Sequence, residues 1–292
     1  MTIPIIDTHQ HLWDTDQFEL PWLEGAAVLK KNHTMADYLA AVEGLDVAKT
    51  VYMEVDVAAH DREREVEFVI DLCSRDDNPM AGAVICADPG SPGFEDYVRK
   101  FAGSPSIKGV RRVLHAPETE KGRCLGEDFV RDVQLLGELG LSFDICLRPN
   151  ELVDAVELAD RCPGTRFIVD HCGNADPAVV AGTSNGSSHG REQWMQDMEA
   201  LGQRPHVVCK ISGIVARVSD PWSPADLAPT VNHCLDVFDP ERVVAASDWP
   251  VCTLGAPVAA WFAALREIIS SRSAADQQRL LHDNAVQLYS LE

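Results

Sequence analysis

The start of the chain places two histidines, His9 and His11, directly after a short apolar run. Side chains in a β-strand alternate between its two faces, so we expect Asp7, His9 and His11 to point to one face. Two imidazoles and a carboxylate that converge can bind a divalent metal or hydrogen-bond to a reacting carbonyl. If the run is the first strand of a parallel barrel, this group lies at the carboxyl end, where such barrels carry their active sites.

Titratable side chains recur at the ends of later apolar runs. Those that we consider candidates for a site are Glu54, Arg111 with Arg112 and His115, Asp170 with His171, and Asp248. Each of them alone also has a structural interpretation: His171 can fill the core, Glu54 can form a salt bridge, and Asp248 can cap a helix. Trp13 and Trp22, which follow the first run, either form an apolar wall for a ring-shaped substrate or anchor a loop by packing.

Eight short apolar, β-branched runs alternate with amphipathic segments along the chain. The runs are 3–9, 50–55, 81–87, 107–114, 142–147, 166–170, 207–212 and 243–247, and helical patterns include 36–45, 63–74, 129–139 and 151–161. Eightfold strand–helix alternation predicts a (β/α)₈ TIM barrel that forms a single domain over residues 1–292. A doubly wound open sheet is less favoured, because it would carry a glycine-rich phosphate turn where His9-Gln10-His11 stands.

One segment, residues 181–190, is small, polar and glycine-rich and follows the sixth predicted strand. On a barrel such a loop overhangs the mouth of the active site, so it is either a lid or an ordinary surface excursion.

Composition limits the class of partner. The formal net charge is −21, which argues against nucleic acid and favours a small-molecule substrate. Nine cysteines without a CxxC pair indicate reduced, buried thiols, and no secretory signal is visible, so we expect a cytoplasmic protein. No apolar run approaches the roughly 18 residues of a membrane span. A homo-oligomer is compatible with this composition.

Four stretches of the sequence resemble one known family. Residues 6–13 (IDTHQHLW), 168–173 (IVDHCG), 246–251 (ASDWPV) and 284–289 (NAVQLY) are similar to the amidohydrolase-2 branch of the amidohydrolase superfamily. Within that branch the chain most resembles sugar-lactone lactonases, of the L-fuconolactonase and L-rhamnonolactonase type, and pyrone-dicarboxylate lactonases. The resemblance covers nearly the whole chain.

The resemblance implies a (β/α)₈ barrel that hydrolyses a cyclic ester. It assigns His9, His11 and His171 to the catalytic centre, Asp248 to the activation of water, and Arg111 to contact with the substrate. The same four residues, His9, His11, His171 and Asp248, would hold a metal if one is present.

Two departures from the family bear on that metal. The fifth predicted strand, 142–147, has no histidine, and Lys108 stands near the start of the fourth strand, so a bridged two-metal centre is not expected. One divalent ion, Zn²⁺ or Mn²⁺, and a metal-independent centre both stay open.

The predicted function is therefore the opening of a sugar (aldono-) lactone by water, with Asp248 as general base. We expect Arg111, Glu54, Trp13, Trp22 and His115 to bind the substrate. Few arginines lie near predicted strand ends, which favours a neutral sugar lactone over an anionic pyrone dicarboxylate. One alternative is a metal-dependent decarboxylase or amidohydrolase acting on a small aromatic or heterocyclic acid. Another is a barrel that binds a sugar acid or a partner without turning it over.

Overall fold

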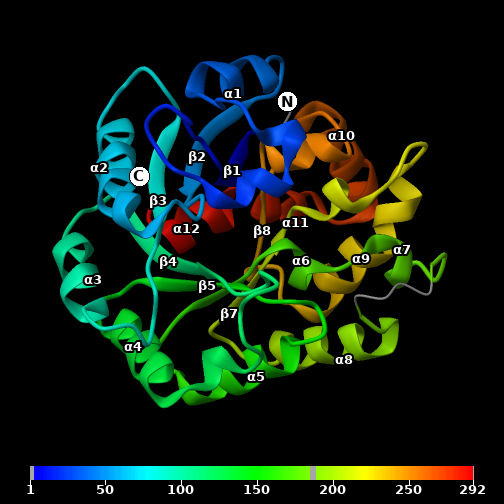
Figure 1. The fold of residues 1–292 in the computed structure, drawn as a ribbon. Coiled ribbons are helices and arrows are strands. Elements are labelled where there is room, and N and C mark those ends of the chain that lie inside the picture. The colour runs from blue at the N-terminus through cyan, green and yellow to red at the C-terminus, as the bar shows by residue number, and fades with distance from the viewer. Residues whose placement is uncertain (1–2, 185–188, 292) are drawn as a thin grey trace.

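Eight parallel strands form one sheet in the order of the sequence. The computed structural model describes residues 3–184 and 189–291, and Figure 1 shows the strands surrounded by helices. The strands are β1 (Ile5–Gln10), β2 (Val47–Met53), β3 (Met80–Cys86), β4 (Ile107–Val113), β5 (Ser142–Cys146), β6 (Phe167–Val169), β7 (Val207–Ile211) and β8 (Val243–Ala245). The (β/α)₈ architecture expected from the alternation is confirmed.

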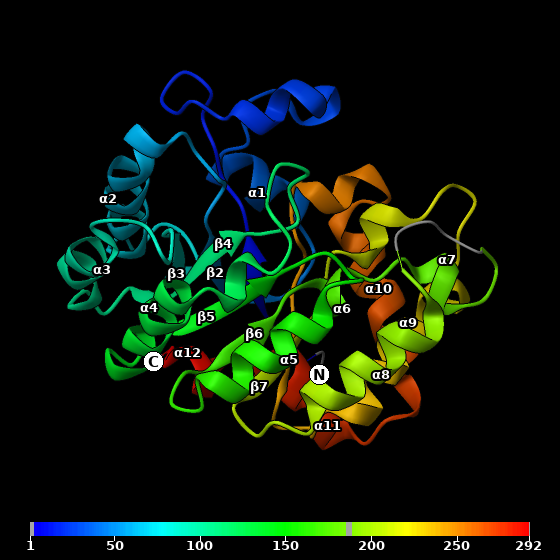
Figure 2. The ribbon, with the colours of Figure 1, turned by 60° about the horizontal axis from the view of Figure 1, so that its bottom comes forward.

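Helices follow the strands, and most of them cover the outside of the sheet, as the two ribbon views show (Figures 1 and 2). They are α1 (Met35–Ala41), α2 (Arg62–Cys73), α3 (Phe94–Ala102), α4 (Glu127–Glu138), α5 (Leu152–Arg161), α6 (His171–Asn174), α7 (Pro177–Val180), α8 (Arg191–Gly202), α9 (Pro224–Val237), α10 (Val258–Ile268), α11 (Ala274–Gln278) and α12 (Asn284–Tyr289). The main apolar core lies between this layer and the strands. The short α6 lies at the carboxyl end of the strands, and α12 lies at the amino end.

The barrel is closed by contacts between the ends of β1 and β8. Gln10 pairs with Trp249 in a parallel bridge, and the Asp248 backbone N–H donates to the His9 carbonyl at 3.0 Å. The His11 N–H donates to the Trp249 carbonyl at 2.8 Å. Closure therefore places the His-x-His segment beside Asp248, although some 240 residues separate them.

A β-bulge in β1 separates Asp7 from the two histidines. Asp7 pairs with Thr50 and Gln10 pairs with Tyr52, so three residues of β1 advance against two of β2. The extra residue shifts the alternation, and the Asp7 carboxylate accepts hydrogen bonds from Tyr38 Oη on α1 at 2.9 Å and from the Ser247 N–H at 2.7 Å. The expectation that Asp7 shares a face with His9 and His11 is therefore wrong.

The amino-terminal end of the barrel is filled by the C-terminal segment. Tyr289 and Leu291 pack with Ile6 and with the inward-facing apolar side chains of the other strands. Lys108 Nζ donates to the Ser290 carbonyl at 3.3 Å, so this lysine lies at the opposite end from the carboxyl termini of the strands. The open end for a substrate is therefore the carboxyl end.

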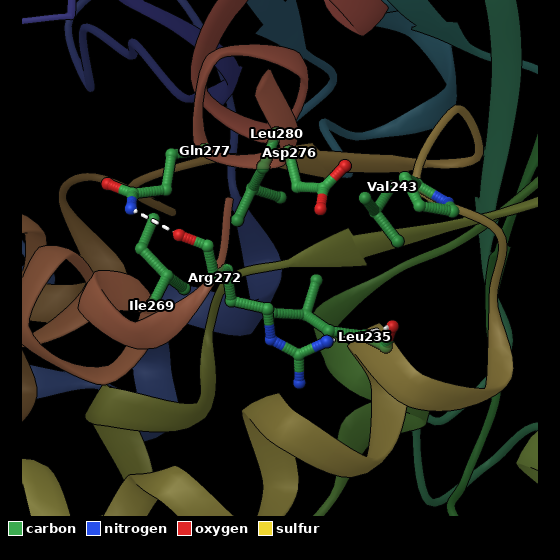
Figure 3. A pocket seen from close by; sticks show the side chains of 8 residues that line it. Leu235, Val243, Ile269, Arg272, Asp276, Gln277 and Leu280 are labelled. Atoms are coloured by element: carbon green, nitrogen blue, oxygen red, sulfur yellow. Dashed lines mark hydrogen bonds between the residues drawn. The ribbon is translucent and has the colours of Figure 1, made fainter. Parts of the chain in front are cut away.

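A small cavity of about 40 Å³ lies at the amino end of β8, between α9 and α11 (Figure 3). Val243, the first residue of β8, lines it, and Gln277 Nε2 donates to the Arg272 carbonyl at 2.9 Å beside it. Its volume is that of one or two water molecules. This cavity is therefore too small to hold a substrate.

The nine cysteines are all free thiols, and only Cys73 is not fully buried, as expected from their place in apolar runs. Among the described residues no helix is both long enough and apolar enough to cross a lipid bilayer. Residues 185–188 of the 181–190 loop lie outside the described part of the chain, so the lid function stays a prediction.

Candidate active site

Three histidines and one aspartate meet at the carboxyl end of the barrel. Asp248 Oδ1 lies 3.3 Å from His11 Nε2, 3.6 Å from His9 Nε2 and 3.9 Å from His171 Nε2. His9 Nε2 and His11 Nε2 are 3.1 Å apart. The four residues named by the sequence therefore surround one point, and they come from strand ends one, six and eight.

The backbone is unusual where this group is built. His171 has a φ of 52° and Asp248 a φ of 59°, in the left-handed region that residues other than glycine seldom adopt. Such conformations cost free energy and persist only where the surrounding structure imposes them. Here they turn both side chains toward the barrel axis at points where a strand has just ended.

The hydrogen-bond partner of His11 decides which of its nitrogens carries the proton. Its Nδ1 lies 3.0 Å from the Met53 carbonyl, which can only accept, so Nδ1 carries a proton and Nε2 is the nitrogen directed at the centre. Burial lowers the pKa of His9 well below its usual value, which favours the neutral ring. Two nitrogen atoms and a carboxylate oxygen thus face each other at 3.1–3.6 Å.

This donor set fits one divalent cation. Two ligand atoms that each lie about 2.1 Å from a common ion are roughly 3.0–3.4 Å apart, close to the separations found here. Two other groups among the described residues have metal-ligand composition. In one, Lys210 already lies 2.9 Å from Asp170; in the other, Arg111 and Arg112 already bind the carboxylates of Glu54 and Asp56 at 2.6 Å. His9, His11 and Asp248 form the better metal site.

Arg111 and Arg112 point to opposite sides of β4, and only Arg111 enters the barrel. Its Nε donates to Glu54 Oε1 at 2.6 Å and its Nη2 to the Glu54 carbonyl at 2.8 Å, while Nη1 lies 3.4 Å from His9 Nε2. Arg112 instead pairs with Asp56 at the edge of the barrel. Glu54 is fully buried and does not line the cavity described below, so its observed contact is with Arg111.

We predict that Arg111→Met lowers the free energy of unfolding by about 3 kcal/mol, because it leaves the buried Glu54 carboxylate without its cation. The matched variant is Arg112→Met, which removes a partly exposed arginine from the same strand and should cost about 1 kcal/mol or less. Urea denaturation of both variants measures the difference. Equal losses would show that the buried Arg111–Glu54 pair contributes no more than the partly exposed pair of Arg112 with Asp56.

Beneath the histidines lies a charged network, of which only Asp170 was among the candidates from the sequence. Lys210 Nζ on β7 is 2.7 Å from Asp144 Oδ2 on β5 and 2.9 Å from Asp170 Oδ1 after β6, and all three side chains are fully buried. Burial raises the pKa of Asp144 to about 7, against the opposing effect of Lys210. The signal available in the sequence was a lysine and an aspartate inside otherwise apolar strands, VVCKI and SFDIC.

A cavity of about 640 Å³ opens above the centre, which is within the usual size range of a small-molecule site. Its floor includes His11, His171, Asp248 and Arg111, whereas His9 lies just below the surface. An apolar side of the wall is formed by Trp13, Trp22, Leu29, Val113, Val251 and Leu254.

The predicted substrate-binding residues other than Glu54 all line this cavity. Trp13 and Trp22 pack edge to face with ring centroids 5.4 Å apart, and each indole N–H donates to a backbone carbonyl at 2.7 Å. They therefore anchor a loop and line the cavity at once, so the two interpretations of these residues are compatible. His115 lies 3.2 Å from Cys146 Sγ, and burial lowers its pKa to about 4. Arg217, also in the wall, was not anticipated and bonds to Asn174.

A parallel barrel with His-x-His on its first strand and an aspartate after its eighth, both facing one cavity, defines an amidohydrolase-type fold and site. The amidohydrolase-2 family model, described as amidohydrolase, matches residues 6–291. The chain belongs to this family.

Three relatives illustrate the similarity. The L-fucono-1,5-lactonase of Burkholderia multivorans is 28% identical over 296 residues, which cover 98% of this chain and 96% of that protein. The 4-sulfomuconolactone hydrolase of Rhizobium radiobacter is 28% identical over 251 residues, covering 84% of this chain and 75% of that one. A zinc-bound amidohydrolase structure from Burkholderia multivorans superposes with a TM-score of 0.84 at 25% identity, covering 99% and 100% of the two chains.

Proposed function

We propose that the protein hydrolyses the ester bond of a small lactone, most favourably a sugar lactone, and so acts in carbohydrate catabolism. The observation that carries the proposal is the convergence of Asp248 with His9, His11 and His171 under an open cavity. Relatives named as lactonases, at 28% identity, support the same reaction class.

Asp248 is the general base of this proposal. Its Oδ1 faces the three histidines, which leaves Oδ2 for a water molecule in the cavity. The carboxylate takes one proton from that water as the water oxygen attacks the carbonyl carbon. When the ring C–O bond breaks, the same proton passes to the departing ring oxygen, and the product is a hydroxy acid.

The developing negative charge on the carbonyl oxygen needs a donor or a cation. Among the cavity-lining groups, Arg111 is always charged and its Nη1 lies 3.4 Å from His9 Nε2, so we assign it as the donor. A divalent ion held by His9, His11 and Asp248, for which we favour Zn²⁺ over Mn²⁺, supplies Lewis acidity at this point when bound.

The charges of the cavity favour a neutral substrate. Arg111 is already neutralised by Glu54, Arg112 points outward, and Arg148 binds Glu151 at 3.0 Å. Of the described arginines that line the cavity, only Arg217 has no carboxylate within 4.0 Å. A dicarboxylate would require several such cations, whereas hydroxyl groups can bond to the neutral polar atoms of the wall.

A screen of aldonolactones by acid release, with and without chelator, tests the proposal. The panel includes six-membered and five-membered sugar lactones and one anionic lactone, with buffer-only hydrolysis as the blank. We expect turnover of neutral sugar lactones. Release of CO₂ from a hydroxybenzoate, with no lactone opened, would instead support the decarboxylase alternative, and no turnover at all would support a binding protein.

A further inference from the structure

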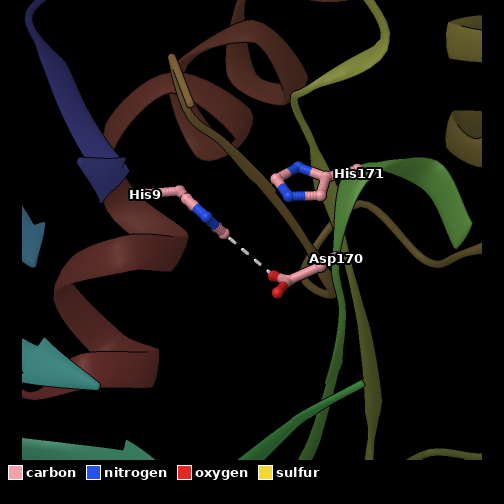
Figure 4. Close-up of side chains that lie close together, drawn as sticks. All are labelled: His9, Asp170 and His171. Atoms are coloured by element: carbon pink, nitrogen blue, oxygen red, sulfur yellow. Dashed lines mark ion pairs between the residues drawn. The ribbon is translucent and has the colours of Figure 1, made fainter. Parts of the chain in front are cut away.

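The buried network of Lys210, Asp144 and Asp170 reaches the proposed centre through His9 and through Arg111, whose Nη1 lies 3.6 Å from Asp170 Oδ2. His9 Nδ1 lies 3.4 Å from Asp170 Oδ1 and 3.4 Å from Lys210 Nζ. Figure 4 shows His9 directed at Asp170, with the His171 ring alongside. The opposite nitrogen of the same ring, Nε2, faces His11 and Asp248. The His9 ring is therefore held between the network and the point where chemistry is proposed.

We propose that Lys210 and Asp170 are positioning residues, which fix the His9 ring so that Nε2 points at the centre. The inference rests on the proposed function for its kinetic readout only. In this arrangement His9 Nδ1 faces both Asp170 Oδ1 and Lys210 Nζ, and Lys210, 2.9 Å from Asp170 Oδ1, holds that carboxylate in place.

The geometry singles out His9 as the residue that needs such support. His11 is oriented by one bond to the Met53 backbone, and the His171 Nδ1 lies 2.9 Å from Ser212 Oγ. Within the described part of the chain, the His9 ring has no backbone or hydroxyl partner of this kind; its nitrogens contact only charged or imidazole groups. Replacing buried ion pairs by apolar side chains is often neutral or stabilising, so stability alone does not account for three charged groups at this place.

Two variants test the inference. Asp170→Asn removes the carboxylate at His9 but leaves Lys210 paired with Asp144, so the fold should be retained. Lys210→Met/Asp144→Asn removes one ammonium and one carboxylate together and leaves Asp170 with Arg111 at 3.6 Å, whereas Lys210→Met alone would also leave the buried Asp144 carboxylate without its cation. Lys108→Met is the matched control, because it removes a lysine from another strand at the opposite end of the barrel.

The readouts are zinc affinity, measured by competition with a chelating dye, then the melting temperature and the separation of kcat from KM. Both test variants should bind zinc ten- to a hundred-fold more weakly and lose kcat by a similar factor, as expected for residues behind a metal-binding histidine. KM should change little, because neither Asp170 nor Lys210 lines the cavity. Lys108→Met should match wild type.

Wild-type zinc affinity in Asp170→Asn would overturn the inference. A second result would also overturn it. If Lys210→Met alone lowers the melting temperature and the activity, but the double variant recovers wild-type zinc affinity and kcat, the network has only a structural role. If no lactone is turned over even by wild type, the proposed function fails separately, and the zinc titration still decides this inference.

Discussion

Asp248→Asn is expected to lower kcat by about a hundred- to ten-thousand-fold while the barrel stays folded, because the variant loses its general base. Asparagine is the appropriate replacement at this position. It keeps the shape of the side chain, and it tolerates the left-handed backbone, φ 59°, better than alanine would. A loss of activity in Asp248→Ala alone could not be attributed to the missing carboxylate, because alanine would also strain the backbone at this position.

Stopped assays on the best lactone of the screen, together with thermal unfolding of each variant, measure this effect. Asp197→Asn is the matched control, since Asp197 is a buried acid on α8 that bonds to Gln193 and does not line the cavity. That variant should keep wild-type kcat. Near wild-type turnover by Asp248→Asn would end the assignment of Asp248 as the base.

Removal of divalent metal is expected to lower activity by more than about a hundred-fold, since Lewis-acid stabilisation contributes several kcal/mol to such a reaction. The structural reason is the convergence of three potential metal-ligand atoms. His9 Nε2, His11 Nε2 and Asp248 Oδ1 lie within 3.6 Å of one another. A divalent cation bound by these atoms would supply the Lewis acidity, so readdition of Zn²⁺ should restore activity.

Stability gives an independent readout of the same site. Zinc at a hundred times its dissociation constant should stabilise the folded protein by about 2.7 kcal/mol, and chelator should reverse this. His11→Asn should abolish the shift, whereas His206→Asn should not, because His206 contacts the Ala159 carbonyl away from the site. Full lactonase activity in protein shown to be free of metal would contradict the prediction and favour a centre that relies on Arg111.

Local patterns in the sequence were sufficient to predict the barrel fold and the types of residue at the carboxyl end of its strands. Strand and helix periodicities depend on neighbouring residues, and eightfold alternation leaves few topologies. Parallel strands then bring their carboxyl ends to one opening. For these reasons the amino-acid sequence alone identifies His9, His11, His171 and Asp248 as one group.

What only the tertiary structure decided depends on register and on contacts across the barrel. The bulge in β1 turns Asp7 away from the histidines. The orientation of β4 in the barrel decides that Arg111, and not Arg112, points into the interior. Lys210 became interpretable only when β5, β6 and β7 placed two aspartates beside it. Alternation within a strand is a local property that a sequence displays, whereas the partner of a buried charge is set by strand pairing and barrel closure, which no single segment encodes.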